Sequence, residues 1–563
     1  MQPSTTKDWH IAEQIPPDVD RALQRFPPLL RQILHNRSYD SEDEALKYLE
    51  ARPPQGNQPE NLLGLAAAVD RIRHAIRHQE RIAIYGDYDA DGVTAAALLT
   101  QALRRLEADV RPYIPNRFDE GYGLNNEALD VLRDEGVRLV ITVDCGMRSN
   151  REAEHAREIG LDLIITDHHT PGVEELPAIA VINPKQPGDA YPDKNLAGVG
   201  IAYKLACALL GETEGVGAEE FLDLVALGTV TDLASLTGEN RFLVREGIKW
   251  LRQPRRQGVY SLINVAQVAA QQITAEAISF ILGPRLNAAG RLDSAMAALE
   301  LLLATEISEA AGLAQILDNH NRERQQLTRQ IQTQAEQIAL EKDPQALLLF
   351  AVDESFNPGV VGLAASRLTE QYYRPAIVAH RGDEFTRGSC RSIPEFHITQ
   401  ALDRCADLLV RHGGHSAAAG FTVRNEHLDE LKQRLVEIAQ EQLGQQDLRP
   451  RLKADAVVPL SEMRPDLLPM LAWLQPTGIG NPPAVFVSQN LKVLRSKTVG
   501  KDGAHLKLTV SDGRITYDAI AFRQGHWQAN MPAYVDLMYQ LEVNEYNGQR
   551  VLQLNVRDLK PSQ

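Results

Sequence analysis

The sequence has few cysteines, and none of them is placed for a disulfide framework or a thiolate metal site. Cys145, Cys207, Cys390 and Cys405 lie far apart, and no Cys-x-x-Cys pair occurs. This spacing favours a reducing environment. No apolar run approaches the roughly 18 residues of a membrane span, and the start, MQPSTTKDWH, lacks the basic and apolar segments of a secretion signal. We therefore expect a cytoplasmic protein without a membrane partner.

Basic residues are outnumbered by acidic ones. There are 59 Lys and Arg against 75 Asp and Glu, which gives a net charge of −16. Such a balance does not favour a nucleic-acid partner, because phosphate contacts require Lys and Arg. The imbalance is not uniform, however, since basic residues outnumber acidic ones within 451–563. Within 487–510, Asp502 is the single acid beside five basic side chains, namely Lys492, Arg495, Lys497, Lys501 and Lys507.

The length of 563 residues predicts three or four domains at about 150 residues each. Residues 1–60, interrupted by pairs of prolines, are interpreted as an N-terminal extension. In 61–240, helical runs alternate with short apolar strands at 81–85, 109–114, 138–143, 162–166 and 179–182. This alternation is typical of βαβ units and predicts an α/β domain with a parallel sheet.

The remaining chain is predicted to form three parts. Residues 241–342 are a helical connector that includes one long helix over 306–341, whose polar middle favours a bridge between domains. Residues 343–448 have the pattern of a second α/β domain. Residues 449–563 contain five β runs separated by Gly turns, which predict a small β-barrel of the OB type.

Acidic and imidazole side chains follow successive strands of the first α/β domain. The carboxyl ends of parallel strands meet at one edge of the sheet, the usual ligand site. Two carboxylates about 4 Å apart repel by about 4 kcal/mol at an effective dielectric near 20, so a cluster of them must be neutralised. Protons could neutralise it by raised pKa values, but divalent cations do so better and give the cluster a reason to exist. Carboxylates mixed with imidazole, without thiolate, favour Mn²⁺ or Mg²⁺. The acidic and imidazole residues at these positions suffice for two ions, as in two-metal phosphoryl transfer. They are Asp87, Asp89, Asp91, Asp144, Asp167, His168, His169 and Asp232.

Each of these motifs also has a simpler explanation. A single Asp after a strand, such as Asp144, usually caps a helix or a turn. A His-His pair by itself is most often a surface feature. The Asp-x-Asp-x-Asp-Gly run resembles part of a calcium loop but lacks the later Glu at the required spacing. The occurrence of all of them together favours the metal site.

Seven motifs carry a resemblance to a known family. YGDYDADG, VDCG, TDHH and TVTD resemble the four successive motifs of the DHH phosphoesterase superfamily. NPGVVGLAASRL, RGSCRS and GGHSAAAG are similar to motifs of its DHH-associated second domain. The resemblance covers residues 60–563. In the order and spacing of its motifs it is closest to the superfamily members that degrade single-stranded DNA.

The resemblance implies a role for each site residue. Two metal ions would be held by Asp87, Asp89, Asp91, Asp144, His168 and Asp232, with Asp144 bridging them. Asp144, His168 and His169 would form the catalytic group. His169 would lie beside the attacking water or the scissile phosphate, and Asp167 would orient the histidines. The residues that would bind substrate phosphates are Arg117, Arg291, Arg387, Ser389, Arg391, Gly413, Gly414 and His415. For Arg117 and Arg291, a surface or interdomain ion pair is an equally good explanation.

The implied activity is a metal-dependent 5′-to-3′ exonuclease that degrades single-stranded DNA to 5′-mononucleotides in DNA repair and recombination. The cofactor would be two ions of Mn²⁺ or Mg²⁺. A monomer is expected, and a single-strand binding protein and a helicase are compatible partners. In the C-terminal domain the basic run would bind the strand together with stacking aromatics, although strand alternation could also bury these rings: Phe486, Tyr517, Phe522 and Trp527.

Two other functions remain open. The same metal site serves nanoRNases, phosphoadenosine phosphatases and cyclic-dinucleotide phosphodiesterases, which do not need a C-terminal strand-binding domain. A catalytically silent replication scaffold similar to Cdc45 could share the fold. Such scaffolds have lost metal ligands, whereas every expected carboxylate and histidine is present here.

Overall fold

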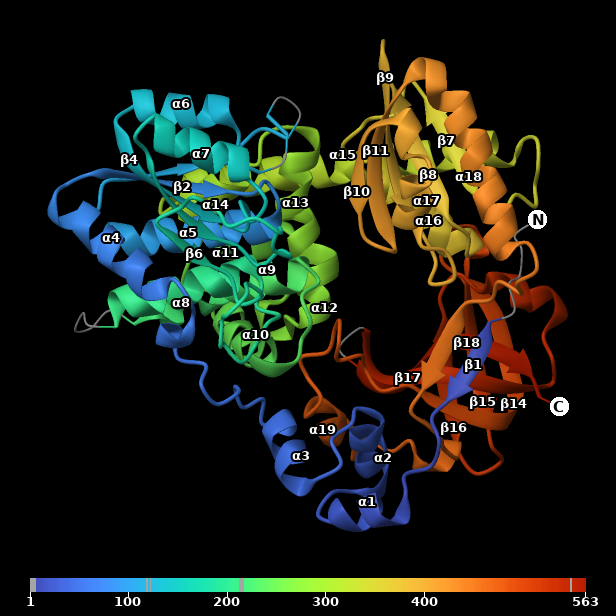
Figure 1. Ribbon diagram of the computed structural model, residues 1–563. Helices are drawn as coiled ribbons and strands as arrows, with labels where there is room; N and C mark the ends of the chain where they lie inside the picture. Colours follow the sequence, from blue (N-terminus) through green and yellow to red (C-terminus); the bar gives the residue numbers. More distant parts are fainter. Residues whose placement is uncertain (1–6, 118–119, 122, 212–216, 547–548, 563) are drawn as a thin grey trace. The chain divides into compact units, whose positions relative to one another are not determined.

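The computed structural model describes residues 7–562 except 118–119, 122, 212–216 and 547–548 (Figure 1). It divides into two compact units. The smaller unit comprises Met1–Asp8, Ala288–Ser294 and Gln315–Arg451, and the larger unit comprises Trp9–Asn287, Ala295–Ala314 and Leu452–Gln563. In the described part of the chain, no helix has both the length and the apolar character needed to cross a bilayer.

A parallel sheet is the centre of the first half of the larger unit. Its strands are β2 (Arg81–Gly86), β3 (Val110–Tyr113), β4 (Val137–Val143), β5 (Asp162–Thr166) and β6 (Ala180–Ile182). They lie in the order β3-β2-β4-β5-β6, and every pairing is parallel. The predicted α/β domain with a parallel sheet is therefore confirmed.

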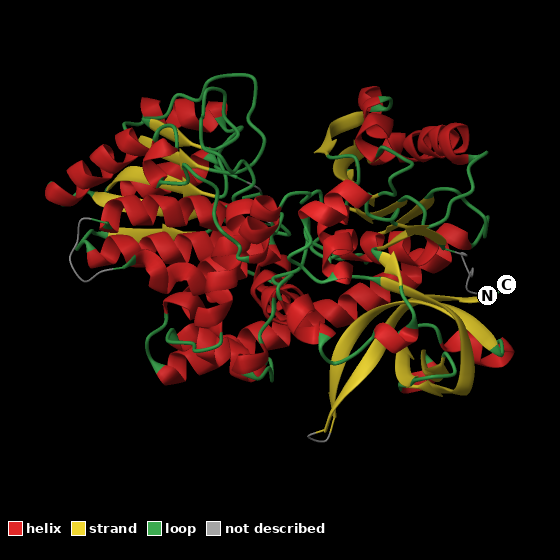
Figure 2. Cartoon of the chain, turned by 90° about the horizontal axis from the view of Figure 1, so that it is seen from below, coloured by secondary structure: helices red, strands yellow, loops and turns green. Residues whose placement is uncertain are grey.

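Helices cover both faces of this sheet (Figures 1 and 2). On one face, α6 (Asn126–Asp134) and α7 (Asn150–Glu158) share a core with alternate strand residues such as Tyr85 and Val140. The other face carries α4 (Leu65–Arg77), α5 (Ala90–Arg105) and α8 (Gly198–Leu210). Because both faces are buried, the strands are continuous apolar runs. Further helices follow: α9 (Leu222–Thr231), α10 (Gly238–Leu251), α11 (Gln257–Val265), α12 (Ala275–Ala277), the π-helix η4 (Ile278–Leu282), α13 (Gly283–Leu292) and α14 (Met296–Leu303).

The C-terminal part of the larger unit is a closed barrel. Its five main strands are β14 (Phe486–Val499), β15 (His505–Ser511), β16 (Thr516–Ala521), β17 (Tyr534–Tyr546) and β18 (Gln549–Pro561). A short β13 (Ala456–Val457) pairs with β14, and α19 (Leu467–Ala472) precedes the barrel. Pairing of β14 with β17 closes the ring. The predicted five-stranded OB-type barrel is thus confirmed.

The N-terminal extension packs against this barrel. It forms α1 (Pro17–Ala22), α2 (Pro28–Asn36) and α3 (Glu42–Leu49), preceded by β1 (Asp8–Ile11), which pairs with β12 (Arg451–Ala454). Leu30 and Ile33 are completely buried in the same hydrophobic cluster as Phe486 of the barrel. The extension is therefore part of the barrel's core rather than a separate appendage.

The smaller unit contains a mixed sheet in the order β10-β11-β9-β8-β7. The strands are β7 (Leu349–Asp353), β8 (Ala376–Arg381), β9 (Phe385–Arg391), β10 (Leu409–Gly414) and β11 (Ala418–Arg424). Only the β7–β8 pair is parallel among these described strands. The accompanying helices are α16 (Val361–Tyr372), α17 (Ile398–Asp403) and α18 (Leu428–Leu443). This is the predicted second α/β domain.

The predicted long helix is α15 (Ile307–Leu340). It passes from the larger unit, which includes its residues up to Ala314, into the smaller unit. The polar middle is not exposed all round, because Asp318 and Asn321 are buried. The Asp318 carboxylate lies 2.7 Å from the guanidinium of Arg322, one turn further along the helix, and this pairing offsets part of the cost of burying its charge.

Candidate metal centre

Three aspartates lie in the turn from β2 into α5. Asp89 caps α5, and its carboxylate accepts hydrogen bonds from the backbone N–H groups of Asp91 and Gly92. Asp91, in the first turn, accepts from the N–H groups of Gly198 (2.7 Å) and Val199 (2.9 Å) at the N-terminus of α8. Two helix N-termini therefore face this turn, and each favours negative charge.

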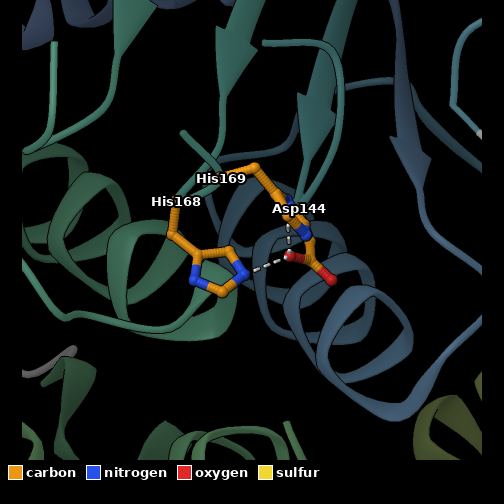
Figure 3. A group of neighbouring side chains, drawn as sticks. All are labelled: Asp144, His168 and His169. Carbon is orange, nitrogen blue, oxygen red and sulfur yellow. Dashed lines mark ion pairs between the residues drawn. The ribbon is translucent and has the colours of Figure 1, made fainter. Parts of the chain in front are cut away.

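The other predicted ligands reach the same place from β4, β5 and α9. Nε2 of His168 lies 3.0 Å from Oδ1 of Asp144 (Figure 3). The same nitrogen lies 3.9 Å from Oδ2 of Asp91 and 3.9 Å from Oδ2 of Asp232. Asp232 comes from the C-terminal end of helix α9 rather than from a strand.

Three overlapping groups of these side chains could each hold an ion. Within each group the potential ligand atoms all lie within 4.8 Å of one another. The groups are Asp144–His168–His169, Asp91–His168–Asp232 and Asp87–Asp89–Asp144. The structure thus brings together all six predicted ligands and His169, and their role as ligands stays a prediction.

Burial and mutual repulsion act on the carboxylates of this cluster. Burial, and then the neighbouring aspartates, raise the pKa values of Asp87, Asp91 and Asp144 well above the usual value. Burial together with Asp89 raises the pKa of Asp232 to about 7. Burial and the adjacent His169 lower the pKa of His168 to about 4, so its imidazole is neutral and able to ligate a metal at neutral pH.

Two buried polar atoms at the centre have no hydrogen-bond partner among the described residues. They are Oδ1 of Asp144 and Nε2 of His168. Leaving a buried polar group unsatisfied costs about 1–3 kcal/mol, and a cation between these two atoms would remove that cost. Carboxylate oxygens with imidazole nitrogen are a donor set that suits Mn²⁺ or Mg²⁺. The residues present therefore fit the predicted ions.

Asp167 holds His169 in place. Its carboxylate accepts hydrogen bonds from Nδ1 of His169 (2.7 Å), from the His169 backbone (3.0 Å) and from the Met147 backbone (2.9 Å). Burial alone would raise the pKa of Asp167, but these hydrogen bonds and the charge of His169 outweigh it and lower the pKa. The same bond raises the pKa of His169 against the effect of burial. This geometry agrees with the orienting role that the resemblance implied for Asp167.

Several residues that hold the centre were missed in the sequence. Nζ of Lys185 donates to the His168 carbonyl (2.6 Å), and Nδ2 of Asn183 donates to that of His169 (2.9 Å). A Cβ on Gly198 would lie 2.6 Å from Cβ of Asp144, and one on Gly228 would lie 2.9 Å from Oδ1 of Asp91. The glycines in AGVGIA and ALGTVTD were the available signal, but which glycine faces a carboxylate depends on how α8 and α9 pack.

Arg117 is the predicted phosphate-binding residue that lies near this centre. Its guanidinium stacks on the ring of Tyr88 at 4.9 Å from the centroid. Its charge also acts to lower the pKa of Asp87 against the larger effect of burial. Part of its motif, at 118–119 and 122, lies outside the described residues.

The other predicted phosphate-binding residues belong to the smaller unit. Arg387, Ser389 and Arg391 alternate along β9 and so point to one face of the sheet. Ser389 is opposite Gly420 of β11, which is opposite Gly413 of β10. A Cβ on Gly362, near the start of α16, would lie 3.2 Å from both Oγ of Ser389 and Nη2 of Arg391. Ser389, Arg391 and Gly413 are therefore neighbours.

The other three predicted phosphate-binding residues of the smaller unit are Gly414, His415 and Arg291. Gly414 has φ +147°, a conformation that favours glycine, and the N–H of His415 donates to the carbonyl of Ala418. Nη1 of Arg291 donates to the carbonyl of Gly359 (3.3 Å). Binding of phosphate by all of these residues stays a prediction.

The prediction that four aromatic rings of the barrel stack on bases is wrong for two of them. Phe486 and Tyr517 are buried in the barrel core, because strand alternation directs them inward. Trp527 packs partly buried against the same core, whereas Phe522 is 52% exposed. Phe522 is the ring among the four that remains available for stacking.

Comparison with known families identifies the class of protein. A model of the DHH family, N-terminal domain, matches residues 81–229, and one of the DHHA1 domain matches 345–443. A model of the RecJ OB domain matches 454–558. The chain thus combines the domains of a DHH-family protein with a barrel of the RecJ type.

Full-length relatives specify the family further. The chain is 37% identical over 564 residues to the single-stranded-DNA-specific exonuclease RecJ of Bacillus subtilis (99% of this chain, 71% of the relative). It is 36% identical to the RecJ of Escherichia coli (95% of this chain, 96% of the relative). The crystal structure of RecJ in complex with Mn²⁺ from Thermus thermophilus matches with a TM-score of 0.85 at 30% identity, over 99% of this chain and 80% of that one. The chain belongs to the RecJ family.

Proposed function

We propose that this protein is a metal-dependent exonuclease specific for single-stranded DNA. Relatives named for this activity match nearly the whole chain at 34–37% identity. Structural relatives from Thermus thermophilus are described in complex with Mn²⁺ and with Mg²⁺. The observation that carries the proposal is the convergence of Asp91, Asp144 and Asp232 on the buried Nε2 atom of the neutral His168 imidazole.

The ligands of the two ions would be Asp87, Asp89, Asp91, Asp144, His168 and Asp232. Bound there, the ions would activate water and stabilise the departing oxygen of a phosphodiester. Asp167 fixes the Nδ1 proton of His169 by accepting it in a hydrogen bond. Nε2 of His169 would bind the attacking water or a phosphate oxygen.

The direction of cutting is also proposed to be 5′ to 3′, with release of 5′-mononucleotides. The support is the resemblance of the chain as a whole to the RecJ exonucleases. Arg387, Ser389, Arg391 and the Gly413–Gly414 backbone would bind phosphates of the strand. Gly413 and Gly414 belong to β10, the edge strand of its sheet, and the edge of a sheet can bind anions. Arg117, Arg291 and His415 would contribute further contacts.

The cellular setting follows from the same resemblance. The enzyme would act as a cytoplasmic monomer in DNA repair and recombination. Its substrate would be supplied by a helicase and shared with a single-strand binding protein.

Digestion of end-labelled DNA tests the proposal. Single-stranded and duplex oligonucleotides, labelled at the 5′ or the 3′ end, are incubated with Mn²⁺, Mg²⁺ or EDTA. We expect metal-dependent release of labelled mononucleotide at once from 5′-labelled single strands and stepwise shortening of 3′-labelled ones. Endonucleolytic cutting, or activity limited to dinucleotides, would contradict the proposal.

Asp144→Ala separates catalysis from binding. We expect this variant to lose Mn²⁺-dependent hydrolysis while binding single-stranded DNA in EDTA as the wild type does. Retained nuclease activity in this variant would refute the proposed bridging role of Asp144.

A further inference from the structure

An apolar groove of about 470 Å³ lies in the larger unit beside the end of α9. Its walls come from the end of α9, the π-helix η4, the loop before the barrel and strands β17 and β18. Three large apolar side chains that line it stay exposed: Phe280 at 75%, Leu233 at 58% and Ile479 at 55%. Exposed apolar side chains gathered in a groove indicate a binding site more strongly than single ones do.

The groove adjoins the end of α9, the helix whose C-terminal end carries the candidate ligand Asp232. Leu233 directly follows Asp232, whose carboxylate belongs to one of the potential metal-binding groups. The end of the π-helix η4 packs closely on the end of α9. A Cβ on Gly283, the residue after η4, would lie 2.4 Å from Oγ1 of Thr231, the last residue of α9. Leu233 therefore lies on backbone next to Asp232, and Phe280 lies three residues before the glycine that packs on Thr231.

Two irregular pieces of backbone present these side chains. Leu233 has φ +63°, which is unfavourable for a residue with a bulky side chain. Phe280 lies in the π-helix Ile278–Leu282, and such turns interrupt α-helices frequently at functional sites. Strain of this kind persists where the surrounding structure enforces it, so it points to a function for the side chains that it holds in the groove.

The charges around the groove suit an uncharged ligand. Glu276, Glu542 and Arg557 line it, so acidic groups outnumber basic ones and a phosphate is not favoured. A nucleobase is planar, largely apolar on its faces and uncharged. Stacking of bases on aromatic side chains is independent of sequence, as an exonuclease requires.

We propose that Phe280 stacks on a nucleobase of the single-stranded substrate, with Leu233 forming the side of this base subsite nearest the metal centre. The inference rests on the proposed function and adds to it a residue that positions the strand. Phosphates of the strand would remain outside the groove, bound by other residues.

Kinetics with and without bases test the subsite. Phe280→Ala is compared with wild type on oligothymidylate and on an oligomer of equal length that carries abasic sites. We expect KM for oligothymidylate to rise about tenfold, within the range that one base stack contributes, with little change in kcat. KM for the abasic oligomer should not change. Tyr260→Ala, which removes a half-exposed ring of α11 outside the groove lining, is the control and should match wild type.

Fluorescence gives a second readout without turnover. Phe280→Trp in EDTA should be quenched by oligothymidylate beyond the wild-type signal, and the abasic oligomer should not quench it. The base subsite would be overturned if KM for oligothymidylate is unchanged in Phe280→Ala and oligothymidylate does not quench Phe280→Trp. If the wild type hydrolyses single strands in the same experiments, the proposed function is unaffected by this result. A wild-type protein that hydrolyses no single-stranded DNA with Mn²⁺ would instead overturn the proposed function.

Discussion

Gly198 lies against Asp144 so closely that a Cβ on this glycine would be 2.6 Å from Cβ of Asp144 and 2.8 Å from its Oδ1. The N–H of the same glycine donates to Asp91. One residue at the N-terminus of α8 thus controls the spacing of two candidate ligands. Neither carboxylate can move away freely, because both are buried.

Gly198→Ala should therefore reduce metal-dependent activity severely, by about 100-fold or more, since catalytic geometry tolerates shifts of only about 1 Å. The matched control is Gly200→Ala in the same helix. A Cβ there meets the Leu196 side chain at 3.5 Å, an ordinary contact. Hydrolysis rates of the two variants at saturating Mn²⁺ give the comparison, and equal rates would contradict the steric role of Gly198.

Asp167→Asn should lower kcat by about 10- to 100-fold, the usual effect of removing a group that orients a site residue. The amide could still receive the Nδ1 proton through its oxygen, but it would no longer hold the charge that raises the pKa of His169. Affinity for Mn²⁺, measured by calorimetry, should stay within a few-fold of wild type. A variant that lost metal binding instead would show that Asp167 is itself a ligand.

Binding of Mn²⁺ should depend on pH through Asp232, whose pKa is raised to about 7. Because the folded state raises the pKa of Asp232, the protonated carboxyl stabilises the folded protein at low pH. This contribution to the free energy of unfolding is lost as pH rises through the folded-state pKa. The metal-free protein therefore becomes less stable between pH 6 and 8. Metal binding becomes stronger over the same range, because Mn²⁺ no longer has to displace a proton from Asp232. One such group makes the apparent affinity about tenfold higher at pH 8 than at pH 6.

Thermal unfolding measures this effect at constant ionic strength. The increase in Tm caused by Mn²⁺ should be larger at pH 8 than at pH 6. In Asp232→Asn the increase in Tm caused by Mn²⁺ should differ less between pH 6 and pH 8 than it does in the wild type. His168 adds little to the difference, because its pKa of about 4 leaves it neutral at both values. An equal metal effect at both pH values in the wild type would contradict the raised pKa.

Leu30→Ala should destabilise the barrel, although Leu30 belongs to the N-terminal extension. Its side chain is completely buried in a cluster that includes Phe486 and Leu508 of the barrel. Truncation of a buried Leu costs about 2–5 kcal/mol. Urea unfolding followed by Trp fluorescence would show this loss, whereas Arg25→Ala, which removes an exposed ion pair with Glu42, should cost less than about 1 kcal/mol. A Leu30→Ala variant as stable as wild type would show that the extension is dispensable.

The strands of the first domain and the meeting of the ligands could be predicted from sequence because both follow from a short-range pattern. Buried parallel strands are apolar runs, and residues directly after them share one edge of the sheet. This places Asp87, Asp144 and His168 together without knowledge of helix packing.

Features that depend on tertiary packing could not be predicted in this way. The closeness of Gly198 to Asp144 requires knowing how α8 approaches the sheet. The burial of Phe486 and Tyr517 depends on which side of each barrel strand faces inward, and the basic run beside them does not determine it. The place of Leu30 in the barrel core joins residues more than 400 positions apart in the sequence.

The most direct test of the metal centre is anomalous scattering from crystals soaked in MnCl₂. We predict two manganese peaks, one of them bound by both Asp144 and His168, with the second ion sharing Asp144. In crystals of Asp144→Ala, both peaks should weaken or disappear. The account would be contradicted if wild-type crystals show no anomalous manganese peak at these side chains, or show manganese only elsewhere on the protein.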